Sequence, residues 1–241
     1  MVGSCGCSAS QASGGARPIH VSVHPSGRYL LCANWGSGSI AVLPIDADGA
    51  LGATAQVVEH PKPYAHMAAT DPAGRWVLAV HYGVGPVFTY HLDLASGRLR
   101  LQSQAHLHPG AGPRHLAFPP GGAVVYVVNE ADSTVTACGW DPDSGRVEPG
   151  PTVRTVPADS SVDNYPSAVL ATEPSLRLVA TYPCGGEFPR DMALGDGGRL
   201  LYVANEHADS VTGLVVDPMD GRLAPADLAV TMARPTCVLP V

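Results

Sequence analysis

Short apolar runs recur along the chain, and each follows a tight polar turn. The first run is Tyr29–Ala33, and its equivalents are Trp76–Val80, Val124–Val128 and Leu200–Ala204. They are too short for helices and are rich in β-branched or aromatic residues, which predicts strands. The turns before them, such as His24–Arg28, place Pro or Asp early and Gly late, a composition typical of tight turns.

A second turn and further strands follow each run, so the repeating unit has four strands. The predicted third strands are Ser39–Ile45, Thr134–Trp140 and Val211–Val216, and hairpins such as Asp141–Arg146 lead to a fourth. Gly27 and Gly74 in the tight turns are 47 residues apart. This period and strand count predict an all-β fold, a β-propeller of four-stranded antiparallel blades.

The repeat is interrupted in its second half. From Gly122 to Gly198 the interval is 76 residues, which is too long for one blade and too short for two. We therefore expect a shortened blade around residues 151–187 that lacks a hairpin. Residues 1–16 are expected to be an N-terminal tail or the remnant of a preceding blade, and residues 17–241 the propeller domain. The whole pattern predicts an incomplete propeller of roughly five blade equivalents.

Two equivalent positions carry different polar residues in different repeats. Relative to the residue that ends each tight turn, the first slot lies nine residues earlier and contains Ile19, His66, Arg114 and Arg190. The second slot lies seven residues later and contains Trp35, Tyr82, Glu130 and Glu206. Both slots open on the same face, and the equivalent positions of propeller blades surround the central channel. We expect a cluster at one mouth of the channel, formed by His66, Arg114, Glu130, Arg190 and Glu206.

Composition and charge narrow the class of ligand. There are 14 Lys and Arg residues against 21 Asp and Glu residues, with no basic run, which argues against nucleic acid and anionic membranes as partners. An anionic ligand must then be bound by a few local arginines. Cysteines and histidines lack metal-ligand spacing and no nucleotide-binding motif occurs, so we expect no metal and no cofactor. The absence of a signal-peptide pattern and of long apolar runs predicts a soluble, cytoplasmic protein.

Several motifs resemble those of the lactonase family of seven-bladed β-propellers, whose activities include 6-phosphogluconolactonase and fungal carboxy-cis,cis-muconate cyclase. The motifs are Pro18–Tyr29, Pro63–His66, Gly112–Phe118, Val127–Glu130 and Phe188–Arg190. The resemblance implies that the catalytic cluster consists of His66, Glu130, Arg114 and Arg190. We expect the substrate to be bound by Arg114, Arg190, His115 and Glu206, and assign Glu206 no catalytic role. The chain departs from the family in the 151–187 region and in having about one blade fewer before residue 17.

These residues predict a carboxylic ester hydrolase that opens a small anionic sugar lactone, above all 6-phosphogluconolactone of the pentose phosphate pathway. Arg114 and Arg190 would bind the anionic group and stabilise the developing oxyanion. Either Glu130 or His66 would activate water, the histidine on condition that it titrates near neutral pH. Two alternatives stay open, a muconate-type lactonizing isomerase and a non-catalytic propeller that binds a partner protein, which the sequence leaves unidentified.

Overall fold

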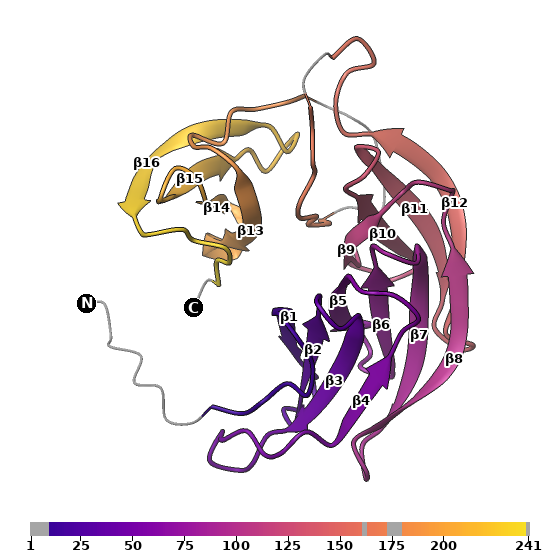
Figure 1. Cartoon of the computed structure of the whole chain (residues 1–241). Coiled ribbons are helices and arrows are strands. Elements are labelled where there is room, and N and C mark those ends of the chain that lie inside the picture. Colours follow the sequence, from indigo (N-terminus) through magenta and orange to yellow (C-terminus); the bar gives the residue numbers. More distant parts are fainter. Residues whose placement is uncertain (1–9, 161–162, 173–179, 240–241) are drawn as a thin grey trace.

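In the computed structural model, four separate sheets of four antiparallel strands make up the fold. The structure describes residues 10–160, 163–172 and 180–239. Three sheets stand side by side, and the fourth lies apart from them, beyond the segment that connects β12 to β13 (Figure 1). The innermost strand of each sheet faces the centre and the outermost lies at the periphery (Figure 1). This confirms the prediction of an all-β, incomplete propeller of four-stranded blades.

The first two blades follow each other without interruption, and their strands are hydrogen-bonded in chain order. Blade 1 consists of β1 (Pro18–Val23), β2 (Tyr29–Asn34), β3 (Ser39–Pro44) and β4 (Gln56–Glu59). Blade 2 consists of β5 (Ala65–Thr70), β6 (Trp76–His81), β7 (Pro86–Asp93) and β8 (Arg98–His106).

Blades 3 and 4 have the same strand order but are separated by a long connection. Blade 3 consists of β9 (Pro113–Ala117), β10 (Val124–Asn129), β11 (Thr134–Asp141) and β12 (Arg146–Arg154). Blade 4 consists of β13 (Pro189–Gly195), β14 (Leu200–Asn205), β15 (Ser210–Val216) and β16 (Leu223–Thr231), with the short 3₁₀ helix η1 (Asp196–Gly198) between β13 and β14.

Blades 1 to 3 are held together by hydrophobic faces that pack between neighbouring sheets. One buried cluster joins blades 1 and 2, with Leu31 and Ile40 on one side and Val77 and Phe88 on the other. A second cluster joins blades 2 and 3, where Leu78 belongs to the shared core. The cluster of blade 4, by contrast, is built from that blade and the adjoining Cys184. Blade 4 is therefore the more loosely attached part of the described chain.

The segments for which we expected irregular blades contain no strand of their own in the described residues. The first four residues of the 151–187 region belong to β12, and its other described residues form no strand. Of the expected tail, residues 1–9 lie outside the described part, and residues 10–16 lie against blade 1. There Thr54 Oγ1 donates a hydrogen bond to the Ala12 carbonyl and Ser13 Oγ donates one to Asn34 Oδ1. In β1, Val21 and Val23 are exposed, at 59% and 56%.

The tight turn of blade 2 depends on one buried carboxylate, and this gives a first prediction. Asp71 is 1% exposed and accepts hydrogen bonds from the backbone N–H groups of Ala73, Arg75 and Trp76. Because Asp71→Ala leaves these donors without their acceptor, we expect it to lower the free energy of unfolding by about 2–4 kcal/mol. Urea denaturation measures this loss. Asp143→Ala, at an exposed carboxylate in the β11–β12 hairpin of blade 3, is the control, and equal losses in both variants would contradict the expected role of Asp71.

Candidate active site

In each of the four blades, a β-bulge in the first strand leaves the first-slot residue without a partner in the strand pairing. In blade 3, Pro113 pairs with Asn129 and His115 with Val128, so Arg114 between them has no partner across the ladder. The same irregularity falls at the equivalent position of the other blades, and the residues concerned are Ile19, His66 and Arg190. Bulges of this kind redirect a side chain and are common beside active sites. Four bulges in equivalent places therefore turn the first slot toward the centre.

The second slot is fixed by a backbone hydrogen bond that also recurs in every blade. The N–H of Glu130 donates to the Gly112 carbonyl at 2.9 Å, and that of Glu206 donates to the Phe188 carbonyl at 3.0 Å. The residue before each glutamate is a fully buried asparagine, Asn129 or Asn205, whose amide donates to threonine hydroxyls of the following strand. These contacts place both glutamates immediately after the second strand, beside the bulge of the same blade.

In blades 3 and 4, the arginine at the bulge forms an ion pair with the glutamate of the second slot. Arg114 Nε lies 3.2 Å from Glu130 Oε2, and Arg190 Nε lies 3.5 Å from Glu206 Oε2. The side chain of Arg114 is 3% exposed, and its guanidinium also donates a hydrogen bond to the Ser167 carbonyl. Burial, and next the charge of Arg190, lowers the pKa of Arg114 to about 10, so the group stays cationic at neutral pH. The two ion pairs lie close enough for the charge of Arg190 to act on Arg114.

Three histidine rings lie edge to face beside these pairs. His66 is 5.2 Å from His115, and His115 is 5.5 Å from His20, between ring centroids. Burial is the main cause that lowers the pKa of all three, and Arg114 acts in the same direction. The pKa falls to about 4 for His20 and to about 2 for His66. All three imidazoles are therefore neutral at physiological pH.

The low pKa of His66 bears on the choice of base that the sequence leaves open. His66 could activate water on the condition that it titrates near neutral pH. Desolvation and the nearby Arg114 disfavour the imidazolium, so the pKa of His66 lies far below that range. A base this weak takes up a proton poorly at neutral pH. His66 is suited to a hydrogen bond from a neutral ring, and its Nδ1 is buried with no partner among the described residues.

The structure adds residues to the site that the two slots missed. His20 and Asp191 occupy the position after the bulge, which is also the position of His115. Shifting the repeat alignment by one residue would have found them. Arg234 donates to Glu206 Oε1 at 2.7 Å, and Ser167 contacts Arg114. Both belong to segments outside the repeats, so periodicity gives no signal for them.

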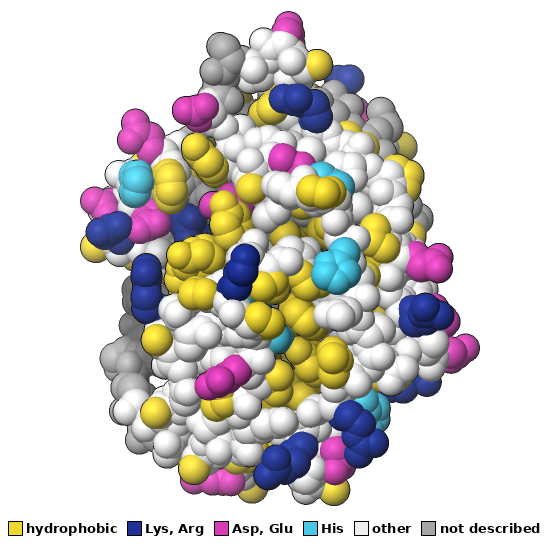
Figure 2. Space-filling model, turned by 45° about the vertical axis from the view of Figure 1, so that its right-hand side comes forward, with side chains coloured by type: hydrophobic (Ala, Val, Ile, Leu, Met, Phe, Trp, Pro, Cys, Tyr) yellow, Lys and Arg dark blue, Asp and Glu magenta, His cyan; other side chains and the backbone are white. Residues whose placement is uncertain are grey.

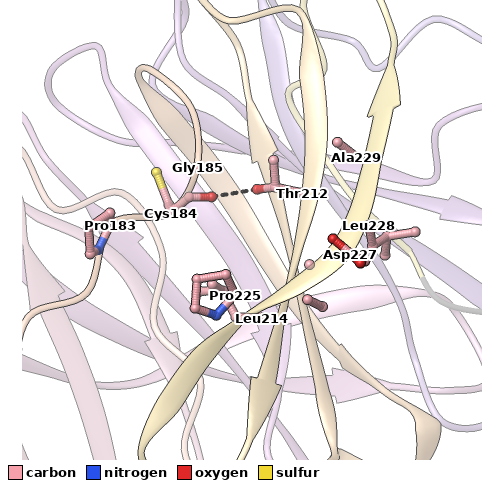
Figure 3. A pocket seen from close by; sticks show the side chains of 11 residues that line it. Pro183, Cys184, Gly185, Thr212, Leu214, Pro225, Asp227, Leu228 and Ala229 are labelled. Carbon is pink, nitrogen blue, oxygen red and sulfur yellow. Dashed lines mark hydrogen bonds between the residues drawn. The ribbon is translucent and has the colours of Figure 1, made fainter.

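Two pockets in the described residues differ in their position relative to this cluster. The first, of about 310 Å³, lies on blade 4 between Cys184, Thr212 and Asp227 and contains none of the predicted site residues (Figure 3). The second, of about 490 Å³, is lined by Tyr82, Gly112 and Ala131, which stand next to the site in sequence. No group of three or more possible metal ligands occurs among the described residues.

Charge on the surface is dispersed. On the face that Figure 2 shows, Lys and Arg side chains are scattered among Asp and Glu side chains, and hydrophobic side chains gather toward the middle. Within the described part of the chain, no helix has the length and apolar character needed to cross a membrane. The face in Figure 2 therefore shows no broad basic patch among its described residues.

Comparison with known proteins identifies the family. The model of the family described as "Lactonase, 7-bladed beta-propeller" matches residues 3–175 and 168–240. The chain belongs to this lactonase family. The two matches overlap at residues 168–175, within the segment that connects β12 to β13.

Curated relatives and solved structures are similar to this chain. The chain is 30% identical to 6-phosphogluconolactonase of Bacillus subtilis (strain 168), over 87% of this chain and 56% of that protein. It is 36% identical to 6-phosphogluconolactonase of Pectobacterium carotovorum, over 58% of this chain and 42% of that protein. The chain thus spans about half the length of these relatives. The structure of the periplasmic gluconolactonase PpgL of Pseudomonas aeruginosa superposes with a TM-score of 0.85 and 26% identity, over 94% of this chain and 73% of that one.

Proposed function

We propose that this lactonase-family chain hydrolyses a sugar lactone, with 6-phosphogluconolactone as the preferred substrate. The observation that carries the proposal is the buried Arg114–Glu130 pair, which faces a second arginine and a neutral histidine at the channel mouth. Relatives named 6-phosphogluconolactonase support the substrate. A phosphorylated sugar substrate agrees with a role in the pentose phosphate pathway and a cytoplasmic location, which we include in the proposal.

The proposed reaction uses the residues of the mouth in distinct roles. Glu130 takes a proton from water as the water oxygen attacks the lactone carbonyl carbon, since His66 is too weak a base at neutral pH. Arg114 and Arg190 stabilise the resulting oxyanion and orient the anionic group of the substrate. The tetrahedral intermediate then collapses to the carboxylic acid, the bond from the carbonyl carbon to the ring oxygen breaks, and the ring oxygen takes the proton held by Glu130 and becomes a hydroxyl group. His66 and His115 form hydrogen bonds to the substrate as neutral rings.

A thermal melt with the reaction product tests the proposal directly. Because a ligand that binds only the folded chain stabilises it by about 2.7 kcal/mol at a hundredfold excess over Kd, 6-phosphogluconate should raise the Tm by roughly 5–10 °C. The same samples are assayed for hydrolysis of 6-phosphogluconolactone and of unphosphorylated gluconolactone. Absence of both a shift and hydrolysis would overturn the proposal. Activity on gluconolactone alone would retain the lactonase and reject the phosphorylated substrate.

A further inference from the structure

The second slot divides the mouth into a charged half and an aromatic half. Blades 3 and 4 place Glu130 and Glu206 there, whereas blades 1 and 2 place Trp35 and Tyr82. The same backbone device holds the aromatic residues, since the N–H of Trp35 donates to the Arg17 carbonyl and that of Tyr82 donates to the Tyr64 carbonyl. The aromatic side chains are thus aimed at the mouth in the same way as the glutamates, although the ion pairs make no use of them.

These two rings form one contiguous surface with Tyr64 and reach His66. The Trp35 ring centroid is 4.5 Å from that of Tyr64, 5.8 Å from that of Tyr82 and 5.3 Å from that of His66. We call Trp35, Tyr64 and Tyr82 the aromatic wall. Because the Trp35 ring meets the His66 ring edge to face, the aromatic wall begins directly beside the cluster of arginines and histidines.

Tyr64 occupies a backbone conformation that favours glycine. Its φ is +89°, and the equivalent residue of blade 3 is Gly112, with φ +61°. A side chain in such a region costs about 1–3 kcal/mol, and strained residues cluster at functional sites. Here the chain retains a large ring that is 41% exposed. The positive φ belongs to the turn itself, since Arg17, Gly112 and Phe188 at the equivalent positions of the other blades share it, and in blade 2 the turn presents a ring to the aromatic wall.

The aromatic wall also has polar atoms and space available to a ligand. Within the described residues, no hydrogen bond engages the hydroxyl of Tyr64, the hydroxyl of Tyr82 or the indole N–H of Trp35. Tyr82 lines the pocket of about 490 Å³ together with Gly112 and Ala131. Since Ala131 directly follows Glu130 in the sequence, one member of the aromatic wall borders a pocket whose lining reaches the residue next to Glu130. Its volume is within the range of small-molecule sites.

We propose that the aromatic wall is the subsite for the sugar ring of the lactone, and so determines specificity for a carbohydrate substrate. A pyranose lactone has an apolar face of C–H groups, which packs against an aromatic ring, and hydroxyl groups, which suit the free phenol and indole groups. With its ring on the aromatic wall, the lactone directs its carbonyl and anionic group toward Arg114 and Arg190. This inference rests on the proposed function, and it assigns a binding surface to the sugar ring, the part of the substrate that the arginines do not bind.

Steady-state kinetics on 6-phosphogluconolactone tests the inference. We expect Trp35→Ala and Tyr82→Ala each to raise KM about tenfold, the effect of losing one aromatic contact, with kcat within about threefold of the wild type. Trp35→Phe and Tyr82→Phe keep a ring and should stay within about threefold in KM. Trp76→Phe is the matched control, because Trp76 is buried between blades 2 and 3 at 7% exposure.

Fluorescence gives a second readout on the same proteins. The chain has three tryptophans, and Trp76 and Trp140 are buried, so Trp35 is the one that a ligand at the mouth can contact. Adding 6-phosphogluconate should change the emission of the wild type and of Trp76→Phe, but not that of Trp35→Phe. If the wild type hydrolyses the lactone and both alanine variants have the KM of the wild type, the role of the aromatic wall is overturned and the proposed function is kept. A wild type without binding or hydrolysis would overturn the proposed function.

Discussion

Arg114→Gln is expected to lower kcat/KM for lactone hydrolysis by a factor of about 100 or more, the usual loss when one oxyanion donor is removed. Arg114 is 3% exposed, and its charge is held between Glu130 and the Ser167 carbonyl. Because its guanidinium is already oriented before the substrate binds, it stabilises negative charge without reorganisation. Arg114→Lys keeps the charge but loses the fork of donors, so its activity should lie between those of the glutamine variant and the wild type.

Controls separate a catalytic loss from a folding defect in this variant. Removing Arg114 leaves Glu130 without its cation, which destabilises a partly buried carboxylate. Thermal melts of the variants therefore accompany the kinetics, and Arg114→Gln combined with Glu130→Gln removes the unpaired charge. Arg222→Gln, at an exposed arginine paired with Asp220 in the last hairpin of blade 4, should keep full activity. Wild-type hydrolysis by a folded Arg114→Gln variant would refute the assignment of Arg114.

The repeat made much of this site predictable from the sequence. An alignment on the tight turns brings Arg114, Arg190 and both glutamates to equivalent positions, and the blade geometry then requires them to meet. The alignment does not show the β-bulge, and for this reason His20 and Asp191, one residue further on, were missed although they share the position of His115. The regular part of the site therefore follows from periodicity, while the bulge has to be seen in the structure.

Other features of the site depend on burial or on non-repeating segments. Ser167 lies in the connection between blades 3 and 4, and Arg234 follows the last strand, so neither has an equivalent in another blade. The sequence likewise gives no measure of how deeply His66 is buried, and burial is the main reason why its pKa is low. The repeat also does not predict how blade 4 is placed relative to the other blades, because that placement depends on the connection between blades 3 and 4.

The buried histidines also predict that the fold is sensitive to acid. The pKa is about 4 for His20 and His60 and about 2 for His66, in each case below the ordinary value of 6.5 because of burial. Below pH 6.5 the unfolded chain binds protons at these rings and the folded chain does not, so unfolding takes up protons. Stability is therefore lost as the pH falls from 6.5 toward 4, by about 1.4 kcal/mol per pH unit for each such ring.

Urea denaturation at pH 7.5, 6 and 5 measures this dependence, and we expect the free energy of unfolding at pH 5 to be at least about 3 kcal/mol lower than at pH 7.5. His60 lies outside the site, where its ring stacks on Phe88 and bonds to the Tyr90 hydroxyl. His60→Gln should thus reduce the slope below pH 6.5 by about 1.4 kcal/mol per pH unit. Equal stability of the wild type at pH 7.5 and pH 5 would mean that these rings take up protons in the folded chain. The neutral state assigned to His66 in the proposed reaction would then be wrong as well, which makes the stability curve a test of the mechanism that needs no substrate.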